Sequence, residues 1–520
     1  MNKIKQSLFI IICLMSQISQ AQKVSVMWNN YENEKLALSV RTEMVEIDNK
    51  FYSLTYPFSI FFKEFNLTML DENLNFLKTI NIPTKYDGNE ITPISMTKAE
   101  SSIIIIFSYF ETTGENRQCL IKTVFNKNLT NPVKFEKIED IQTKSYFNPK
   151  TDWDLYYYNE NRDVIIMKVP REALKKSDVY NITAYNNSLS KKEWTATMDL
   201  GKLAEDYILT DNLFTSKAEF VFILKIEQKG FKLKTGNMLL CKFSKQNGLT
   251  FKEIVFKDGE NDYESSLELM LNKAQDKIYI YGHTKRKGTE NDYLYLKNFD
   301  IETLSEIDNI SIDLGNPKEN GLNDNTFFGV PYTIDDFVIN TLDLNNENGN
   351  ITIVGEACKF PQQKTQKNPD GTRTSYLDPG MNSTILCLKI NKEGKILEKY
   401  RIPRKMKLKT YEHPFSSYIF FQDSNGTSFL FYDDPKNENF TSFNKDIKIK
   451  QIDHDKDLDL YVVKIDKNNK ISKSKVVRDY TGNLSKLTKK QNFETYMAKP
   501  FSKNKFLVKA EKNVGILTIE

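Results

Sequence analysis

Short apolar runs alternate with polar turns along the whole chain. In "NKAQDKIYIYGHT", residues 272–284, a polar segment meets the apolar run 278–281, and Gly282 ends it. The run is too short for a helix, and it lacks the strict apolar–polar alternation of a strand with one face in water. This pattern predicts a β-strand that is covered on both faces.

The same pattern recurs eight times. Polar turns lead into apolar runs at 48–56, 99–110, 160–170, 216–226, 274–284, 347–357, 424–434 and 502–512. Further candidate strands precede and follow each run, and Asn, Asp and Gly in the turns suit hairpins. Four strands per unit predict an all-β fold, a single β-propeller of about eight blades, with seven as the alternative count. Blades stack on each other, which would cover the middle strands on both faces. A series of unrelated hairpins in sandwich domains is the competing interpretation.

The two ends of the chain suggest how such a ring would close. The last unit stops at Glu520 after its third strand, and a lone strand-like stretch, "KVSVMW", lies at 23–28. We expect this N-terminal strand to join the last blade, which would remove exposed sheet edges. The propeller domain is then expected to span 22–520.

The first 21 residues have the features of a secretory signal peptide. Lys3 and Lys5 precede the apolar run 8–15, and Ala21 offers a small residue for cleavage before Gln22. We therefore expect an exported protein that is periplasmic, at the cell surface or secreted. An amphipathic first helix and a lipoprotein acylated at Cys13 are the alternatives. No later apolar run approaches the ~18 residues of a membrane-spanning helix, so no transmembrane span is expected.

The composition excludes some function classes. Lys and Arg total 73 against 69 Asp and Glu, so the chain lacks the strong basic excess of a dedicated nucleic-acid binder. Cys119, Cys241, Cys358 and Cys387 lie far apart, and no C-x-x-C metal pair exists. Buried thiols are the expected state, with a bridge between Cys358 and Cys387 as the alternative.

Two segments resemble a known class of proteins. "ILCLKINKEGKI" (385–396) and "LYVVKIDKNNKI" (460–471) resemble the strand–turn–strand units of exported bacterial β-propeller proteins of unassigned function, and so does "FLFYDDPKNENF" (429–440). The resemblance covers blades rather than the whole chain. It implies a fold and a compartment, but no chemistry. The double glycine of kelch blades is absent.

An acidic loop is the sharpest local signal for a ligand. Asp453, Asp455 and Asp457 occupy alternate positions in "DHDKDLDLYVV", and hard oxygen ligands at that spacing can converge on calcium. However, Leu458 replaces the turn glycine and Tyr461 replaces the acid at the ninth position. A solvated acidic loop is therefore the expected state, with calcium as the alternative, and no other cofactor is expected.

Catalytic signatures are missing from the sequence. His283, His413 and His454 fall in different units, and no G-x-S-x-G elbow marks a serine nucleophile. The basic run 401–409 is interpreted as a solvated loop, and the aromatic run 153–159 as packing between blades rather than a glycan groove. No catalytic residue is assigned.

These observations lead to one main function and two alternatives. The main hypothesis is a non-catalytic propeller that binds a protein or glycan at a loop-lined rim, and the insert 359–382 is the best loop candidate. The alternatives are an enzyme acting on a glycan or peptide, and a structural subunit of an envelope assembly. Two or more carboxylates that converge with a tyrosine or arginine would favour the enzyme. A rim of lysine and asparagine alone would disfavour it.

Overall fold

The computed structural model describes most of the strands and tight turns of the chain. The described residues are 24–28, 40–57, 64–111, 116–142, 151–170, 179–226, 238–254, 267–272, 276–285, 292–315, 336–344, 350–359, 362–367, 372–378, 381–391, 395–402, 404, 406–407, 418–423, 426–433, 437, 452–453, 459–468, 470–476, 499–502, 505–510 and 513–519. The N-terminal segment 1–21 lies outside them.

The described chain is all-β and forms a succession of antiparallel sheets. Sheet 1 contains β2 (Val40–Ile47), β3 (Lys50–Pro57), β4 (Phe65–Leu70) and β5 (Phe76–Ile82). Sheet 2 contains β6 (Lys85–Tyr86), β7 (Asn89–Ala99), β8 (Ser102–Glu111), β9 (Arg117–Asn126) and β10 (Phe135–Gln142). Sheet 3 contains β11 (Thr151–Tyr157), β12 (Val164–Pro170), β13 (Val179–Tyr185) and β14 (Lys192–Asp199).

The next sheets repeat this plan. Sheet 4 follows the short helix α2 (Leu203–Asp206) and contains β15 (Tyr207–Phe214), β16 (Phe220–Ile226), β17 (Met238–Ser244) and β18 (Gly248–Ile254). Sheet 5 contains β19 (Glu268–Leu271), β20 (Lys277–Lys285), β21 (Asp292–Asp300) and β22 (Glu306–Gly315). Sheet 6 contains β23 (Asp336–Leu344), β24 (Ile351–Lys359), β27 (Met381–Ile390) and β28 (Ile396–Ile402), and β29 (Met406–Lys407) and β32 (Ile452–Asp453) extend it.

Two further sheets complete the described chain. Sheet 7 contains β30 (Tyr418–Asp423), β31 (Gly426–Asp433), β33 (Asp459–Asp466) and β34 (Ile471–Lys475). The terminal sheet contains β35 (Lys499–Ser502), β36 (Lys505–Ala510), β37 (Asn513–Ile519) and, from the other end of the chain, β1 (Val24–Trp28). β1 pairs antiparallel with β37, as the sequence predicts for "KVSVMW".

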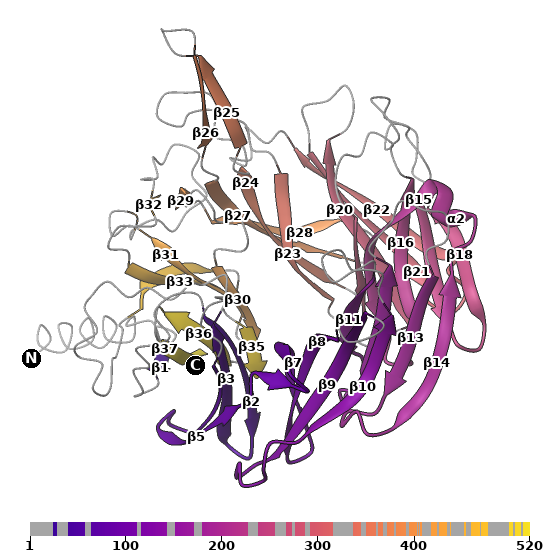
Figure 1. The fold of residues 1–520 in the computed structure, drawn as a ribbon. Helices are drawn as coiled ribbons and strands as arrows, with labels where there is room; N and C mark the ends of the chain where they lie inside the picture. The colour runs from indigo at the N-terminus through magenta and orange to yellow at the C-terminus, as the bar shows by residue number, and fades with distance from the viewer. Residues whose placement is uncertain are drawn as a thin grey trace, which may run out of the picture.

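The strand order gives each sheet an inner and an outer edge. In sheet 2 we count β7 as the first strand, because the two-residue β6 pairs only with the start of β7. In Figure 1 the first strands β2, β7, β11, β23, β30 and β35 lie toward the middle of the view, and the last strands β5, β10, β14 and β18 lie at its periphery. Contacts and hydrogen bonds connect the first strands of consecutive sheets, for example β2 with β7 and β15 with β19. We call these first-strand edges the inner edges.

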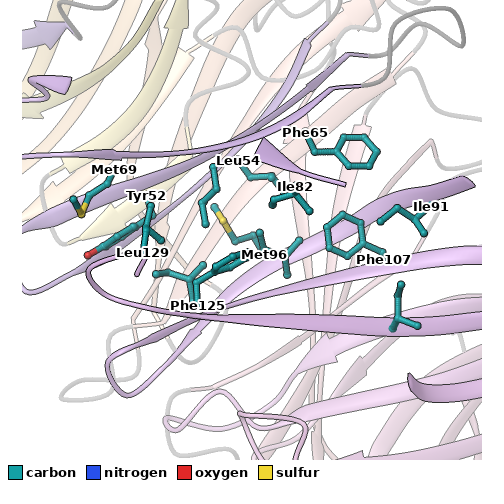
Figure 2. Packing of buried hydrophobic residues seen from close by; sticks show 14 of the residues in the cluster. Tyr52, Leu54, Phe65, Met69, Ile82, Ile91, Met96, Phe107, Phe125 and Leu129 are labelled. Carbon is teal, nitrogen blue, oxygen red and sulfur yellow. The ribbon is translucent and has the colours of Figure 1, made fainter. Parts of the chain in front are cut away.

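Consecutive sheets pack face to face through shared apolar clusters. In β20, Ile278 and Ile280 belong to a cluster with sheet 4, whereas Tyr279 between them belongs to a cluster with sheet 6. Figure 2 shows the cluster between sheets 1 and 2, where Tyr52 and Leu54 face Phe107 and Phe125. β20 is thus covered on both faces. This confirms the prediction for residues 272–284, and it explains why such strands lack apolar–polar alternation.

In several sheets, a leucine in the turn between the third and fourth strands packs into the apolar cluster shared with a neighbouring sheet. Leu74, Leu129, Leu189 and Leu304 are buried with positive φ, and the backbone N–H of each donates to the carbonyl of Asp or Asn three or four residues earlier. Leu129 packs against sheet 1, Leu189 against sheet 2 and Leu304 against sheet 4. Each leucine therefore reaches the sheet that precedes its own. The left-handed conformation costs about 1–2 kcal/mol per residue, which this burial offsets.

The predicted middle strands are confirmed at all eight positions, as β3, β8, β12, β16, β20, β24, β31 and β36. The insert 359–382 differs from expectation. It is not a plain loop, because β25 (Gln362–Lys367) and β26 (Arg373–Asp378) form a hairpin that pairs with no other described strand. Figure 1 shows the hairpin standing away from the sheets. Within the described residues, no helix has the length and apolar character needed to cross a membrane.

Gly426 occupies a position at the start of β31 that admits no side chain. Its φ is +139°, and an added Cβ would lie 2.1 Å from the backbone oxygen of Ile465 on β33. We expect Gly426→Ala to lower the free energy of unfolding by about 2–3 kcal/mol, because backbone strain and overpacking add. Urea unfolding measures it. Gly201→Ala, at a positive φ in open space, is the control and should cost only about 1 kcal/mol. Equal losses of stability in the two variants would show that the backbone near Ile465 moves to relieve the clash.

Candidate functional site

A row of polar side chains recurs along the inner edges of sheets 1 to 5. Glu43, Ser95, Asp154, Asp211 and Glu268 lie on the five first strands, opposite the fourth or fifth residue of each second strand. Asp154 is exposed, and the other four side chains are half-buried. We call these five residues the inner-edge row.

Hydrogen bonds connect the row from sheet to sheet. The backbone N–H of Met96 on β7 donates to Glu43 on β2, and the Ser95 hydroxyl lies 2.9 Å from the hydroxyl of Tyr157 on β11. These bonds join the inner edges of sheets 1, 2 and 3, which share no backbone ladder.

The connections continue through sheets 3, 4 and 5. The Tyr156 hydroxyl on β11 donates to Asn212 Oδ1 on β15 over 2.9 Å, and the backbone N–H of Leu269 on β19 donates to Asp211 on β15. Hydrogen bonds therefore join the inner edges of all five sheets in succession.

β-Bulges in two of the first strands set the direction of two side chains in the row. The register of β7 against β8 shifts between Pro93 and Ser95, and the register of β15 against β16 shifts between Leu209 and Asp211. A bulge bends its strand and re-aims the side chains beside it. Ser95 and Asp211 thus follow directly after the residue that is left out of register.

Asp211 is held at both carboxylate oxygens. Oδ1 accepts the backbone N–H of Asn212 over 2.8 Å, and Oδ2 accepts the N–H of Leu269. Its role is to position, because it fixes β19 against β15. Glu268 comes immediately before Leu269, so Asp211 also fixes where the Glu268 carboxylate lies.

Two tyrosine hydroxyls lie beside carboxylates of the row, each within its own sheet. The Tyr281 hydroxyl donates to Glu268 Oε2 over 2.6 Å. The Tyr156 hydroxyl lies 3.4 Å from Asp154 Oδ2, farther than from Asn212. Burial raises the pKa of both tyrosines well above its usual range, and the adjacent carboxylates raise it further, with Asp211 contributing to each. Both hydroxyls are therefore protonated donors at neutral pH.

The Tyr281–Glu268 pair predicts a pH dependence of stability. Because the folded-state pKa of Tyr281 lies above the unfolded value of 10.0, its stabilisation is present below about pH 10 and is lost as the pH rises above 10. At pH 8 we expect Tyr281→Phe to cost about 1.5–3 kcal/mol, the range for a hydrogen bond to a charged group. The difference from wild type should shrink toward pH 12 in urea unfolding. Parallel stability curves for the two proteins would contradict this assignment.

Charge is distributed unequally between the strands. Among side chains that the structure describes, the first strands carry six acidic residues and one lysine: Glu43, Glu46, Glu90, Asp154, Asp211, Glu268 and Lys98. The second strands carry five lysines and three acidic residues: Lys50, Lys168, Lys225, Lys277, Lys505, Glu111, Glu356 and Asp433. The inner edges are thus negative, a potential that repels polyanions such as nucleic acids.

A buried ion network joins sheets 6 and 7. Arg404 Nη1 lies 3.4 Å from Glu356 Oε1, and Lys473 Nζ lies 2.6 Å from Asp433 Oδ2. Asn437 donates to Asp433 over 2.7 Å and accepts from Lys473 at its backbone oxygen over 2.8 Å. Burial lowers the pKa of Arg404, and the nearby carboxylates Glu356 and Asp433 oppose this. At 1–3% side-chain exposure, the ions in this network are structural and do not meet solvent.

The structure describes only some of the candidate residues selected from the sequence. Asp453 lies in β32, whereas Asp455 and Asp457 fall outside the described residues, so calcium binding there stays a prediction. His283 lies in β20 opposite Leu294, and His413 and His454 also fall outside the described residues. Within the described part, no group of three or more His, Cys, Asp or Glu has a metal-binding arrangement.

The bridge considered between Cys358 and Cys387 is wrong. The two residues do lie on neighbouring strands, but Cys387 faces Val354 and Cys358 faces Asn382. An offset of four residues separates the Cα atoms by roughly 13 Å along the strands, beyond the ~7 Å limit of a disulfide. Cys387 is a free buried thiol, and burial raises its pKa to about 12.

The structure also tests two local predictions from the sequence, for the runs 401–409 and 153–159. Arg404 from the basic run 401–409 is buried, so a solvated loop is wrong for that residue. Packing is correct for most of the aromatic run 153–159, where Trp153 is buried between sheets 2 and 3. The inner-edge row itself was missed. Its one sequence signal is a polar residue seven to ten positions before each second strand, at 43, 95, 154, 211 and 268.

Comparisons with known proteins identify no family for this chain. No protein family model matches it, and no curated protein matches it in sequence. Among solved structures, a polysaccharide lyase is similar at 10% identity and a TM-score of 0.35, over 96% of this chain and 92% of that one. An α-L-arabinanase from Penicillium chrysogenum, complexed with arabinobiose, is similar at 10% identity and a TM-score of 0.31, over 64% and 93%.

A puromycin-hydrolysing peptidase from Mycobacterium tuberculosis is similar at 9% identity and a TM-score of 0.34, over 94% of this chain and 61% of that one. At these TM-scores the similarities carry no argument about the site. The assignment of a function therefore depends on this chain's own residues.

Proposed function

We propose that the chain is an exported β-propeller with eight blades, namely sheets 1 to 7 and the terminal sheet. The turn leucines support closure into a ring. Leu129, Leu189 and Leu304 each pack against the preceding sheet, and Leu74 of sheet 1 packs with Ile516 of the terminal sheet. A closed ring would put the terminal sheet directly before sheet 1, and this contact supports such closure.

We further propose that the inner-edge row is the active site of an enzyme acting on a glycan. The observation that carries this proposal is the row itself: carboxylates from four sheets, joined through tyrosine hydroxyls and backbone amides, on partly exposed inner edges. The arrangement supplies the carboxylates and tyrosines that the enzyme hypothesis requires. It also provides the carboxylates, amides and hydroxyls that form hydrogen bonds with sugar hydroxyls.

Two of the carboxylates are assigned to the chemistry. Because both oxygens of Asp211 bind backbone N–H groups, Asp211 positions the site, and Glu268 and Asp154 act on the substrate. Hydrolysis of a glycosidic bond uses one carboxylic acid to protonate the leaving oxygen and one carboxylate as base or nucleophile. Tyr281 orients Glu268 by donating to it.

A glycan fits this arrangement better than a peptide. Peptide hydrolysis by carboxylates alone requires two acids close enough to share one proton. Here the carboxylates come one from each sheet, and Asp211 on β15 lies between the strands that carry Asp154 and Glu268. Two separate carboxyl groups suit hydrolysis of a glycosidic bond, in which one protonates the leaving oxygen and the other acts at the opposite face of the sugar.

Substitution of Glu268 tests the proposal. We expect the purified chain to release reducing ends from a member of a polysaccharide panel. In Glu268→Gln, kcat should fall by about 10²–10⁴-fold, the usual contribution of general acid–base catalysis, while binding is retained. Glu253→Gln on the outer strand β18 is the matched control and should retain full activity.

Two outcomes would count against this function. Unchanged cleavage in Glu268→Gln would move the active site elsewhere. Binding without cleavage by the wild-type chain would favour the second candidate, a non-catalytic binding protein. The exposed, polar β25–β26 hairpin supports that second candidate, because it stands clear of the sheets where a partner can reach it.

A further inference from the structure

The terminal sheet is assembled from both ends of the chain. β1 runs antiparallel to β37 over five residue pairs, from Val24 opposite Ile519 to Trp28 opposite Gly515. Among the described strands, β1 pairs with β37 and with no other. The five residues of β1 therefore pair with five of the seven residues of β37, Gly515 to Ile519.

The edge that receives β1 is held in place by other contacts. β37 pairs with β36 on its other side, and Ile516 packs into a cluster with Phe51 and Leu74 of sheet 1. The acceptor edge is thus preformed by groups that do not involve β1. Without a paired strand, such an edge presents a row of backbone N–H and C=O groups that templates further pairing.

We propose that the outer edge of β37 is a peptide-acceptor site, filled by the chain's own N-terminal strand and able to accept the same strand from a second copy. An identical segment reproduces the same register and contacts, so exchange between copies gives up no pairing. Eleven residues separate Trp28 from Val40, which span up to about 40 Å when extended. This is long enough to reach a neighbouring molecule. The proposal does not depend on the glycan site.

A disulfide trap distinguishes pairing within one chain from pairing between two. Ser25 lies opposite Thr518, and facing residues of an antiparallel pair have Cα atoms about 4.5–5.5 Å apart, within disulfide range. Ser25→Cys with Thr518→Cys is made in the full chain beginning at Gln22. The protein is unfolded, refolded at several concentrations, oxidised and separated on a non-reducing gel. Ser25→Cys alone controls for random oxidation.

We expect an intramolecular bridge at low concentration and a disulfide-linked dimer whose fraction rises with concentration. An intramolecular bridge at every concentration would overturn exchange between copies. Equal dimer in the single-cysteine control would also overturn exchange between copies, and the absence of any bridge would overturn the acceptor edge itself.

A second measurement uses added peptide. Val26→Pro in the full chain fixes φ and adds a ring in the middle of β1, and we expect it to weaken the pairing of β1 with β37. A synthetic peptide of residues 22–29 should then raise the melting temperature of this variant in a saturable manner. The same peptide carrying the proline should not. No shift with the wild-type peptide would contradict the proposal.

Discussion

Replacing Arg404 by alanine is expected to lower the free energy of unfolding by about 3–5 kcal/mol. Arg404 is 1% exposed at its side chain, and its guanidinium lies 3.4 Å from Glu356 and 5.3 Å from the ring centre of Phe431. The substitution removes the cation beside the Glu356 carboxylate, which is 2% exposed, and breaking a buried ion pair at one partner has a cost of this size. Urea unfolding followed by tryptophan fluorescence measures it.

A double variant separates the charge from the packing. Arg404→Met with Glu356→Leu removes both ions and fills much of their volume. Replacement of a buried pair by apolar residues is often neutral, so this variant should lose far less stability than Arg404→Ala. Equal losses in the single and double variants would mean that the two ions are not coupled.

Replacing Phe107 by alanine is expected to cost about 3–5 kcal/mol as well, for a different reason. Phe107 is fully buried on β8, in the cluster that Figure 2 shows between sheets 1 and 2. Its ring centre lies 5.8 Å from that of Phe65 and 5.7 Å from that of Phe135. Truncation removes buried apolar area and leaves a cavity, because strands on both faces limit collapse. Differential scanning calorimetry or urea unfolding measures the loss.

Phe251 provides the matched control for the core prediction. It lies on the outer strand β18 and is 50% exposed. Phe251→Ala should change the stability by no more than about 0.5 kcal/mol, as is usual for surface sites. A loss at Phe107 as small as that at Phe251 would contradict the face-to-face packing of sheets 1 and 2.

The order of strands was readable from the sequence because it depends on local signals. Runs such as 103–107 and 220–223 consist of β-branched and aromatic residues, and both lie in buried middle strands. The pairing of β1 with β37 followed from counting strands, since the last unit lacks a fourth. Such patterns predict which segments form strands and which strands are buried between sheets.

The site was not readable in the same way, because it depends on contacts between sheets. Nothing near Asp211 in sequence reveals that its carboxylate receives the amide of Leu269, 58 residues later. The bulge before Asp211 adds a shift of one residue that no alternation pattern shows. Arg404 was misjudged for a related reason, since its acidic partner Glu356 belongs to another strand 48 residues earlier.

A crystal structure of the Glu268→Gln variant, grown with an oligosaccharide that the wild-type chain cleaves, tests the central claim most directly. The account predicts that the sugar lies on the inner edges of sheets 3 to 5, with hydrogen bonds to Asp154 and contact with Tyr156 and Tyr281. A sugar bound on the outer strands or on the β25–β26 hairpin, with the inner-edge row unoccupied, would contradict it.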